Sequence, residues 1–194
     1  MLDLRLFLAI DIPNSARGKI TEAQSFYKAL NLDAAWVKSS NMHLTLKFLG
    51  NTQPGLIPKI KSRIAEIAKA TPPFSITLGN VGVFPDLSRP RVLWVGIVEA
   101  EGRLSSLKEK IEQQMTQLGF PADKKQSVHH LTLGRIKSGK GMERLKKAIE
   151  SAHPINMNTF EVSSVQLIKS ELTPKGSIYT VQEEFIFSGP ITRH

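Results

Sequence analysis

A tetrapeptide that occurs twice, letter for letter, is the strongest constraint on how this chain can fold. The run His-Leu-Thr-Leu at positions 43–46 returns 87 residues later at positions 130–133, in a chain of 194 residues with only five histidines. Side chains of a β-strand alternate between two faces, so each copy would present its histidine and threonine on one face and its leucines to a core. Two such matched strands predict an internal duplication that brings both histidines to one shared site.

Other features of the chain keep the same offset, as expected if a whole unit was duplicated. Apolar strand patterns, one-sided helical patterns and Pro or Gly breaks follow one another in the same order in each copy. The first copy predicts strands at 5–12, from 43 and at 74–78, with helices at 15–30 and 56–68, and the second predicts strands at 92–98, from 130 and at 160–168, with helices at 104–118 and 142–149. The copies span approximately residues 4–83 and 91–170. A last strand at 178–187 has no counterpart, and the sequence does not assign it to either copy.

The duplication predicts an α+β fold of two pseudo-symmetric lobes. Each lobe is expected to hold an antiparallel-rich sheet with helices on its outer face, because a one-sided helix must bury its apolar stripe against a sheet. The two histidine-bearing faces would then meet across a central cleft, where ligand sites commonly occur. No linker rich in Gly, Ser or Pro separates the copies, so residues 1–194 are expected to form one bilobal domain.

Composition narrows the chemistry. Hydrophobic residues make up 41% of the chain, which is enough for a good core, and the absence of cysteine excludes disulfides, thiolate nucleophiles and sulfur-ligated metals. The net charge of +9 favours nucleic acid or phosphorylated molecules as partners, although a solubilising surface explains the same charge equally well. An early acidic residue and a short apolar run at the N-terminus predict a soluble cytoplasmic protein without membrane contact.

Two histidines at one site can perform proton transfer at phosphorus. With an ordinary pKa of about 6.5, one imidazole can act as a neutral base while the other acts as a protonated acid. The hydroxyls of Thr45 and Thr132 are suited to donate hydrogen bonds to phosphoryl oxygens that gain charge. No carboxylate or third histidine lies at ligand spacing from the motifs, so we expect no metal and no cofactor.

These features together resemble the 2H phosphoesterase superfamily, which is named for two His-x-Thr-x motifs, and within it the RNA 2′,3′-cyclic phosphodiesterases, also called 2′-5′ RNA ligases. The resemblance covers nearly the whole chain. It rests on the runs at 5–10, 36–37, 43–50, 83–85, 91–96, 130–135, 170–172 and 176–179. It implies a metal-independent enzyme that opens 2′,3′-cyclic phosphates at RNA ends and leaves a 2′-phosphomonoester, with joining of RNA ends as the reverse reaction.

The resemblance also implies roles for individual residues. His43 would protonate the leaving 3′ oxygen and His130 would activate water, although the identical motifs do not themselves distinguish acid from base. Thr45 and Thr132 would bind the phosphate, and Arg135 would join them if a bulge or the strand end turned it to the face of His130. The expected partner is therefore RNA ending in a 2′,3′-cyclic phosphate, and we expect a monomer without a protein partner.

Some neighbours of the motifs have open roles at this point. Strict alternation puts Lys47 on the face of His43 and Phe48 in the core. His129 stands where relatives often have proline, and alternation turns it away from the site. Several cations flank the second motif or the strand before it and could follow an RNA backbone: Arg89, Arg91, Lys124, Lys125, Lys137 and Lys140. One aromatic side chain could stack on the terminal base, but the sequence does not select it.

Two other functions remain open. The same pair of motifs would suit an enzyme acting on a small cyclic phosphate derived from a nucleotide. It would also suit an RNA-binding module in which the histidines contact phosphate without catalysing a reaction.

Overall fold

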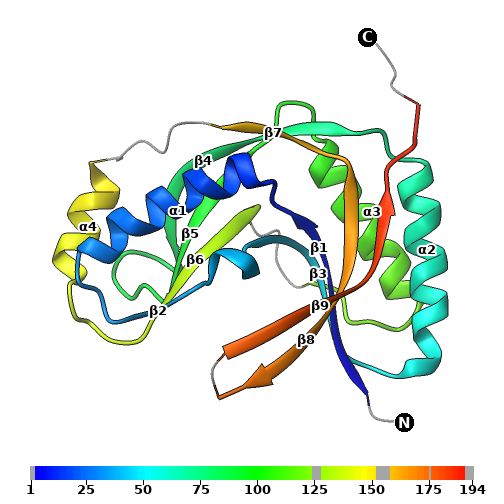
Figure 1. The fold of residues 1–194 in the computed structure, drawn as a ribbon, viewed down its shortest axis with the longest axis horizontal. Coiled ribbons are helices and arrows are strands. Elements are labelled where there is room, and N and C mark those ends of the chain that lie inside the picture. The colour runs from blue at the N-terminus through cyan, green and yellow to red at the C-terminus, as the bar shows by residue number, and fades with distance from the viewer. Residues whose placement is uncertain (1–2, 124–127, 152–157, 175, 191–194) are drawn as a thin grey trace.

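The described part of the chain folds into two antiparallel sheets with four α-helices (Figure 1). The computed structural model describes residues 3–123, 128–151, 158–174 and 176–190. The first copy of the repeat forms β1 (Leu4–Asp11), α1 (Asn14–Ala29), β2 (Ala34–Trp36), β3 (His43–Thr52), α2 (Ile57–Lys69) and β4 (Phe74–Phe84). The second copy forms β5 (Val92–Val98), α3 (Arg103–Gln117), β6 (His130–Ile136), α4 (Met142–Glu150), β7 (Thr159–Val162) and β8 (Ser164–Thr173), and β9 (Gly176–Ile186) follows it. The predicted α+β class is confirmed.

Each sheet takes strands from both copies. The first sheet has the order β3-β1-β8-β9, and the second has the order β2-β6-β5-β4-β7. In each copy the third long strand therefore crosses to the other lobe, where β4 pairs with β5 and β8 pairs with β1. The two lobes do not correspond to the two halves of the sequence.

One predicted strand is two strands in the structure. The pattern at 160–168 predicts a single element, but the chain leaves the second sheet after Val162 and enters the first sheet at Ser164. β7 pairs with β4, whereas β8 pairs with β1. The final strand, which the sequence left unassigned, forms a hairpin with β8 and is the edge of the first sheet.

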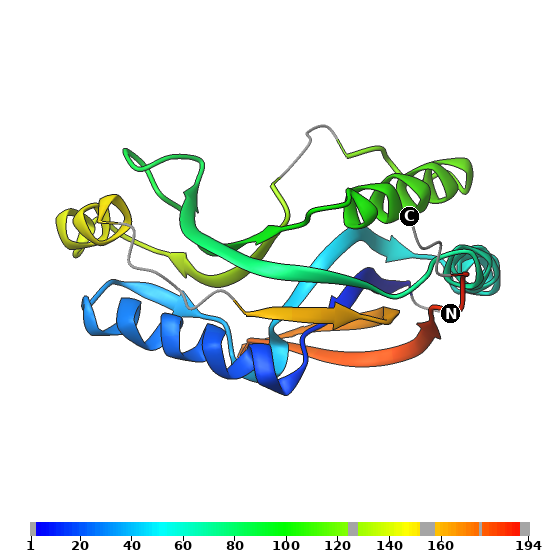
Figure 2. The same ribbon diagram turned by 90° about the horizontal axis from the view of Figure 1, so that it is seen from above.

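Each lobe also takes one helix of its pair from each copy of the repeat. α2 and α3 contact each other and the first sheet, although they come from different copies. α1 lies against the second sheet, where the Gln24 side-chain amide donates to the Leu133 carbonyl oxygen of β6 at 2.9 Å. Arg144 of α4 donates to the Leu30 carbonyl oxygen at the end of α1. The α1 and α4 pair and the α2 and α3 pair thus occupy opposite ends of the long axis (Figures 1 and 2).

A continuous core joins the two lobes. The helices bury apolar residues at helical spacing, such as Ile60, Ile64 and Ile67 of α2, in the same cluster as the strand residues of both sheets. β1 is a central strand with residues 6–10 buried on both of its faces. Phe7 and Ala9 belong to a separate small cluster on the face away from the helices. Among the described residues, no helix combines the length and the apolar character needed to cross a bilayer.

Candidate active site

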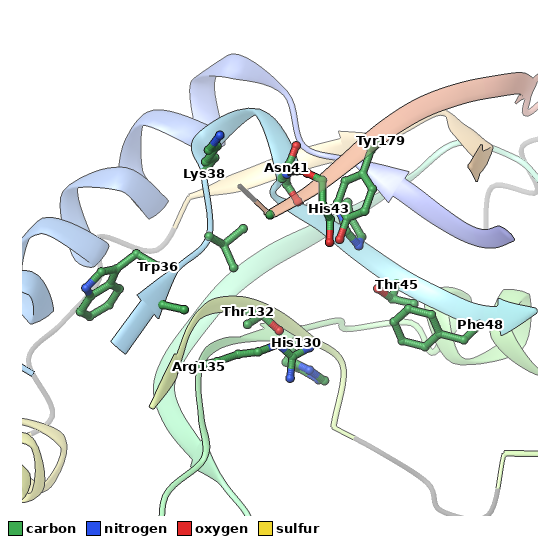
Figure 3. A pocket seen from close by; sticks show the side chains of 14 residues that line it. Trp36, Lys38, Asn41, His43, Thr45, Phe48, His130, Thr132, Arg135 and Tyr179 are labelled. Atoms are coloured by element: carbon green, nitrogen blue, oxygen red, sulfur yellow. Dashed lines mark hydrogen bonds between the residues drawn. The ribbon is translucent and has the colours of Figure 1, made fainter. Parts of the chain in front are cut away.

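The two motif strands face each other across one cavity. The cavity has a volume of about 310 Å³, and β3 and β6 supply opposite walls of it (Figure 3). All five side chains selected from the sequence line it: His43, Thr45, His130, Thr132 and Arg135. Further walls come from β2, from the turn that precedes β3 and from β9. The structure thus brings together two imidazoles and two threonine hydroxyls that are 87 residues apart in sequence.

Each motif strand contains a β-bulge at the same place. Next to β1, Ala9 pairs with Thr45 and Leu8 with Lys47, so that Leu46 is the extra residue. Next to β5, Trp94 pairs with Thr132 and Leu93 with Gly134, so that Leu133 is the extra residue. A bulge reverses the alternation of side chains beyond it. The fifth residue after each motif histidine therefore joins the face of that histidine.

The bulge brings different side chains to the cavity in the two copies. In β6 it turns Arg135 toward the cavity, as the sequence allowed. In β3 it turns Phe48 toward the cavity with 61% of the residue exposed, so the prediction that Phe48 lies in the core is wrong. The pseudo-symmetric cavity is thereby cationic on one side and aromatic on the other.

Lys47 is buried, contrary to its predicted position on the face of His43. Only 1% of its surface is exposed, and its ammonium group donates to Glu112 Oε1 at 2.8 Å, to the Pro121 carbonyl oxygen at 2.6 Å and to Asp123 Oδ1 at 3.2 Å. Burying a charge is tolerated when it is paired and hydrogen-bonded, as it is in this cluster. Lys47 thus ties β3 to α3 and to the segment that leaves α3, and it does not line the cavity.

Backbone carbonyl groups orient both imidazoles. His43 Nδ1 lies 2.8 Å from the carbonyl oxygen of Asn41, and His130 Nδ1 lies 2.8 Å from that of Val128. A carbonyl oxygen can only accept, so each Nδ1 must carry a proton. Each Nε2 is then the nitrogen that takes up or releases a proton, which is the arrangement needed for acid and base catalysis.

Aromatic rings support both imidazoles from the neighbouring strands. Phe7 and Tyr179 lie with their ring centroids 4.8 and 5.2 Å from that of His43. The ring centroids of Phe84 and Trp94 lie 4.9 and 6.2 Å from that of His130. Phe7 and Trp94 are themselves 87 residues apart, so the duplication includes this support. Rings packed in this way restrict imidazole motion.

Burial lowers the pKa of both histidines below 6.5. For His43, the hydrogen bond to Asn41 and the charge of Asp11 act in the opposite direction without outweighing burial. For His130, the hydrogen bond to Val128 opposes burial, while the charges of Lys108 and Arg135 add to it. Desolvation disfavours the imidazolium, so both rings are mainly neutral at pH 7 in the absence of a bound anion.

Three aromatic rings line the cavity, and their surroundings differ. Trp36 packs against the backbone of β6, since a Cβ at Gly134 would lie 3.0 Å from its ring, and Lys28 lies 5.8 Å from its centroid. Tyr179 is packed edge-on against Phe7 and His43. Phe48 is the exposed ring of the three (Figure 3). Sequence reasoning did not single out Lys38, Asn41 or Tyr179 as lining residues, because the first two precede the motif and Tyr179 follows it by more than 130 residues.

Among the other candidate cations, the four that the structure describes do not line this cavity. The structure shows Arg89, Arg91, Lys137 and Lys140 exposed outside it, whereas Lys124 and Lys125 lie outside the described residues. His129 points away from the cavity, as alternation predicts, and contacts Ser105 instead. Within the described ranges, no group of three His, Asp or Glu side chains is arranged to hold a metal ion.

Comparison with known proteins identifies the family. The model of the LigT like phosphoesterase family matches the chain twice, over residues 10–94 and 95–179. The RNA 2′,3′-cyclic phosphodiesterase of Methanothermobacter thermautotrophicus is 32% identical over 184 residues, which is 95% of this chain and 99% of that protein. The protein of the same name from Aquifex aeolicus is 36% identical over 161 residues, which is 82% of this chain and 85% of that protein. The crystal structure of TT0787 of Thermus thermophilus has a TM-score of 0.80 at 29% identity and covers 95% of this chain and 98% of its own. The chain therefore belongs to the LigT-like phosphoesterase family.

Proposed function

We propose that this protein hydrolyses 2′,3′-cyclic phosphates at RNA ends to 2′-phosphomonoesters, without a metal or another cofactor. The observation that carries the proposal is the single cavity lined by two copies of an imidazole and a hydroxyl. The relatives that share about a third of its residues along most of the chain bear the name RNA 2′,3′-cyclic phosphodiesterase. The net charge of +9 suits a polyanionic substrate.

The mechanism is an in-line displacement at phosphorus. His130 takes a proton from water through Nε2 as the water oxygen bonds to phosphorus, and protonated His43 gives its Nε2 proton to the 3′ oxygen as the bond from phosphorus to that oxygen breaks. The two histidines end with exchanged protonation states and return to the starting states through solvent. Thr45, Thr132 and Arg135 donate to the nonbridging oxygens, where negative charge increases in the transition state.

The unequal walls of the cavity support this assignment of acid and base. The leaving 3′ oxygen belongs to a ribose that carries a base, so the acid should be on the side that receives the nucleoside. Phe48 shares β3 with His43 and offers an exposed ring on which a base of any type can stack. Arg135 shares β6 with His130 and attracts the phosphate. The reverse reaction, joining of ends through a 2′-5′ bond, uses the same groups in the opposite direction, and we propose hydrolysis as the main activity.

The test is turnover of an oligoribonucleotide that ends in a 2′,3′-cyclic phosphate, in the presence of EDTA. The expected product is the 2′-monoester, and each of His43→Ala and His130→Ala should lower kcat by about 10²- to 10⁴-fold while RNA affinity is retained. Absence of any monoester product would refute the proposal. If the wild type binds the RNA without turnover and the alanine variants lose affinity, the protein is a binding module. Faster turnover of a cyclic mononucleotide than of the oligonucleotide would indicate a small-molecule enzyme.

A further inference from the structure

The residue immediately before each motif histidine anchors its strand on the face away from the cavity, and the two copies use different chemistry for this. Met42 precedes His43 and is 2% exposed within the main core. His129 occupies the equivalent position before His130 and makes polar contacts instead. The second motif is therefore held by hydrogen bonds where the first is held by apolar packing.

His129 is held by the start of α3. Glu99 accepts hydrogen bonds from the backbone N–H of Leu104 at 2.6 Å and of Ser105 at 3.1 Å, which is a favourable place for a carboxylate at a helix N-terminus. The Ser105 hydroxyl donates to Glu99 Oε1 at 2.5 Å, and His129 Nε2 lies 3.0 Å from the same hydroxyl oxygen. A hydroxyl has one proton, so His129 must be the donor to Ser105.

The charged and titratable groups around His129 come from three elements. Glu99 follows β5, with a carboxylate oxygen 3.6 Å from His129 Nε2. Lys108 lies on α3, and His130 is the next residue along the chain; both interact electrostatically with the His129 ring. The hydrogen-bonded Glu99 carboxylate and Ser105 hydroxyl thus fix the imidazole of His129 on one side. The main-chain carbonyl oxygen of His129 accepts from the Ile97 N–H of β5 at 2.8 Å.

The anchored residue adjoins the carbonyl group that sets the protonation of His130. That carbonyl group belongs to Val128, which is about half exposed. The corresponding carbonyl before His43 belongs to Asn41, which lies in a 3₁₀ turn and donates its side-chain amide to the Ser177 carbonyl oxygen at 2.9 Å. Arg17 reaches the same region by donating to the Ser39 and Met42 carbonyl oxygens. Within the described residues, these contacts anchor the segment before the first motif, and the contacts of His129 anchor the segment before the second.

We propose that His129 is a positioning residue: by donating to Ser105 it holds the Val128 carbonyl against His130 Nδ1, and so keeps His130 Nε2 available for proton transfer. The effect on turnover rests on the proposed function, whereas the effect on the protonated nitrogen does not. A neutral histidine without the carbonyl acceptor is free to carry its proton on Nε2, and a base with its proton there cannot accept another.

The test is nitrogen-15 NMR of the imidazole rings, recorded without substrate at a pH well above 6.5. In the wild type, both His43 and His130 should be protonated at Nδ1. In His129→Ala, the His130 signals should shift toward a mixture of the two tautomers while those of His43 stay unchanged, which provides an internal control. In His129→Gln, whose amide can still donate to Ser105, the wild-type pattern should return.

Turnover supplies the second measurement. A misplaced catalytic base costs up to about a hundredfold in rate, so His129→Ala should lower kcat by about ten- to a hundredfold with KM nearly unchanged, and His129→Gln should recover most of it. Ser105→Ala removes the acceptor without changing His129, and it replaces His129→Ala if that variant does not fold. If His130 stays protonated at Nδ1 in His129→Ala, or in Ser105→Ala where His129→Ala does not fold, the proposal is wrong. Failure of the proposed function alone would remove turnover in the wild type and leave the NMR result intact.

Discussion

Replacing Lys47 by methionine tests whether this buried cation stabilises the fold. Alternation predicted Lys47 on the face of His43, whereas the structure buries it. Methionine is apolar and unbranched like the lysine stem, so Lys47→Met keeps most of the packing and removes the charge. The variant leaves Glu112, Asp123 and the Pro121 carbonyl oxygen without their shared donor. The perturbation is therefore mainly electrostatic.

The expected cost follows from how much solvent reaches the partners. Removing one member of a buried ion pair costs about 3–5 kcal/mol, because the other charge stays buried without compensation. Here the Glu112 side chain is 24% exposed and that of Asp123 is 45% exposed, so water recovers part of this loss. We expect a decrease of about 3 kcal/mol in the free energy of unfolding, equivalent to roughly 6–12 °C in Tm for a chain of this size.

The pKa of Glu112 predicts how this loss varies with pH. Burial acts to raise that pKa, but the hydrogen bonds from Lys47 and from the Asp123 N–H, with the charges of Lys47 and Lys108, lower it below 4.5 overall. A carboxyl group whose pKa is lower in the folded state stabilises the protein above its unfolded pKa, and this contribution is lost as the pH falls through the folded pKa. The difference between wild type and Lys47→Met should therefore be largest near pH 7 and should shrink below about pH 4.5.

Urea unfolding at pH 7 measures the effect, and Lys61→Met is the matched control. Lys61 pairs with Glu183 at 2.6 Å, but both side chains are more than a third exposed, so its replacement should cost at most about 1 kcal/mol. The double variant with Glu112→Gln should recover part of the loss, because it removes the uncompensated carboxylate and keeps an acceptor for Asp123. Equal effects of Lys47→Met and Lys61→Met, within about 0.5 kcal/mol, would refute the electrostatic account.

Three further predictions concern the cavity and the aromatic ring of Trp94 that packs against His130. Because burial lowers the pKa of both His43 and His130, the profile of kcat/KM should have its maximum on the acid side of pH 6.5, and a maximum above pH 7 would contradict this. Phe48→Ala should raise KM for an oligonucleotide substrate by about 5- to 100-fold with little change in kcat, as expected for loss of one stacked base, and an unchanged KM would exclude this ring as the stacking surface. Gly82→Ala would put a Cβ 2.3 Å from the Trp94 ring. It should destabilise the protein by about 1–3 kcal/mol in urea unfolding, and an unchanged free energy of unfolding would show that the ring moves aside without cost.

The bulges show where sequence reasoning was right and where it was wrong. Alternation assigned His43, Leu44 and Thr45 correctly, because these residues precede the bulge. It failed at Lys47 and Phe48, the first residues after the extra residue Leu46. A bulge is defined by the pairing of a strand with its neighbour, and the pattern within one strand does not reveal it. The corresponding bulge in β6 turns Arg135 toward the cavity. From the sequence, this position of Arg135 was only one of two alternatives.

The sequence by itself determined the duplication, the class of the fold and the pair of histidines, because local patterns and an exact repeat are properties of the chain alone. The tertiary structure decided which copy supplies each strand and helix to each lobe, the split at Ser163, and the contrast between Phe48 and Arg135 across the cavity. It also decided that Lys47 of β3 pairs with Glu112 of α3 and that His129 contacts Ser105 of α3. All of these depend on hydrogen bonds and ion pairs between segments far apart in the chain, and such pairings arise only when the sheets assemble.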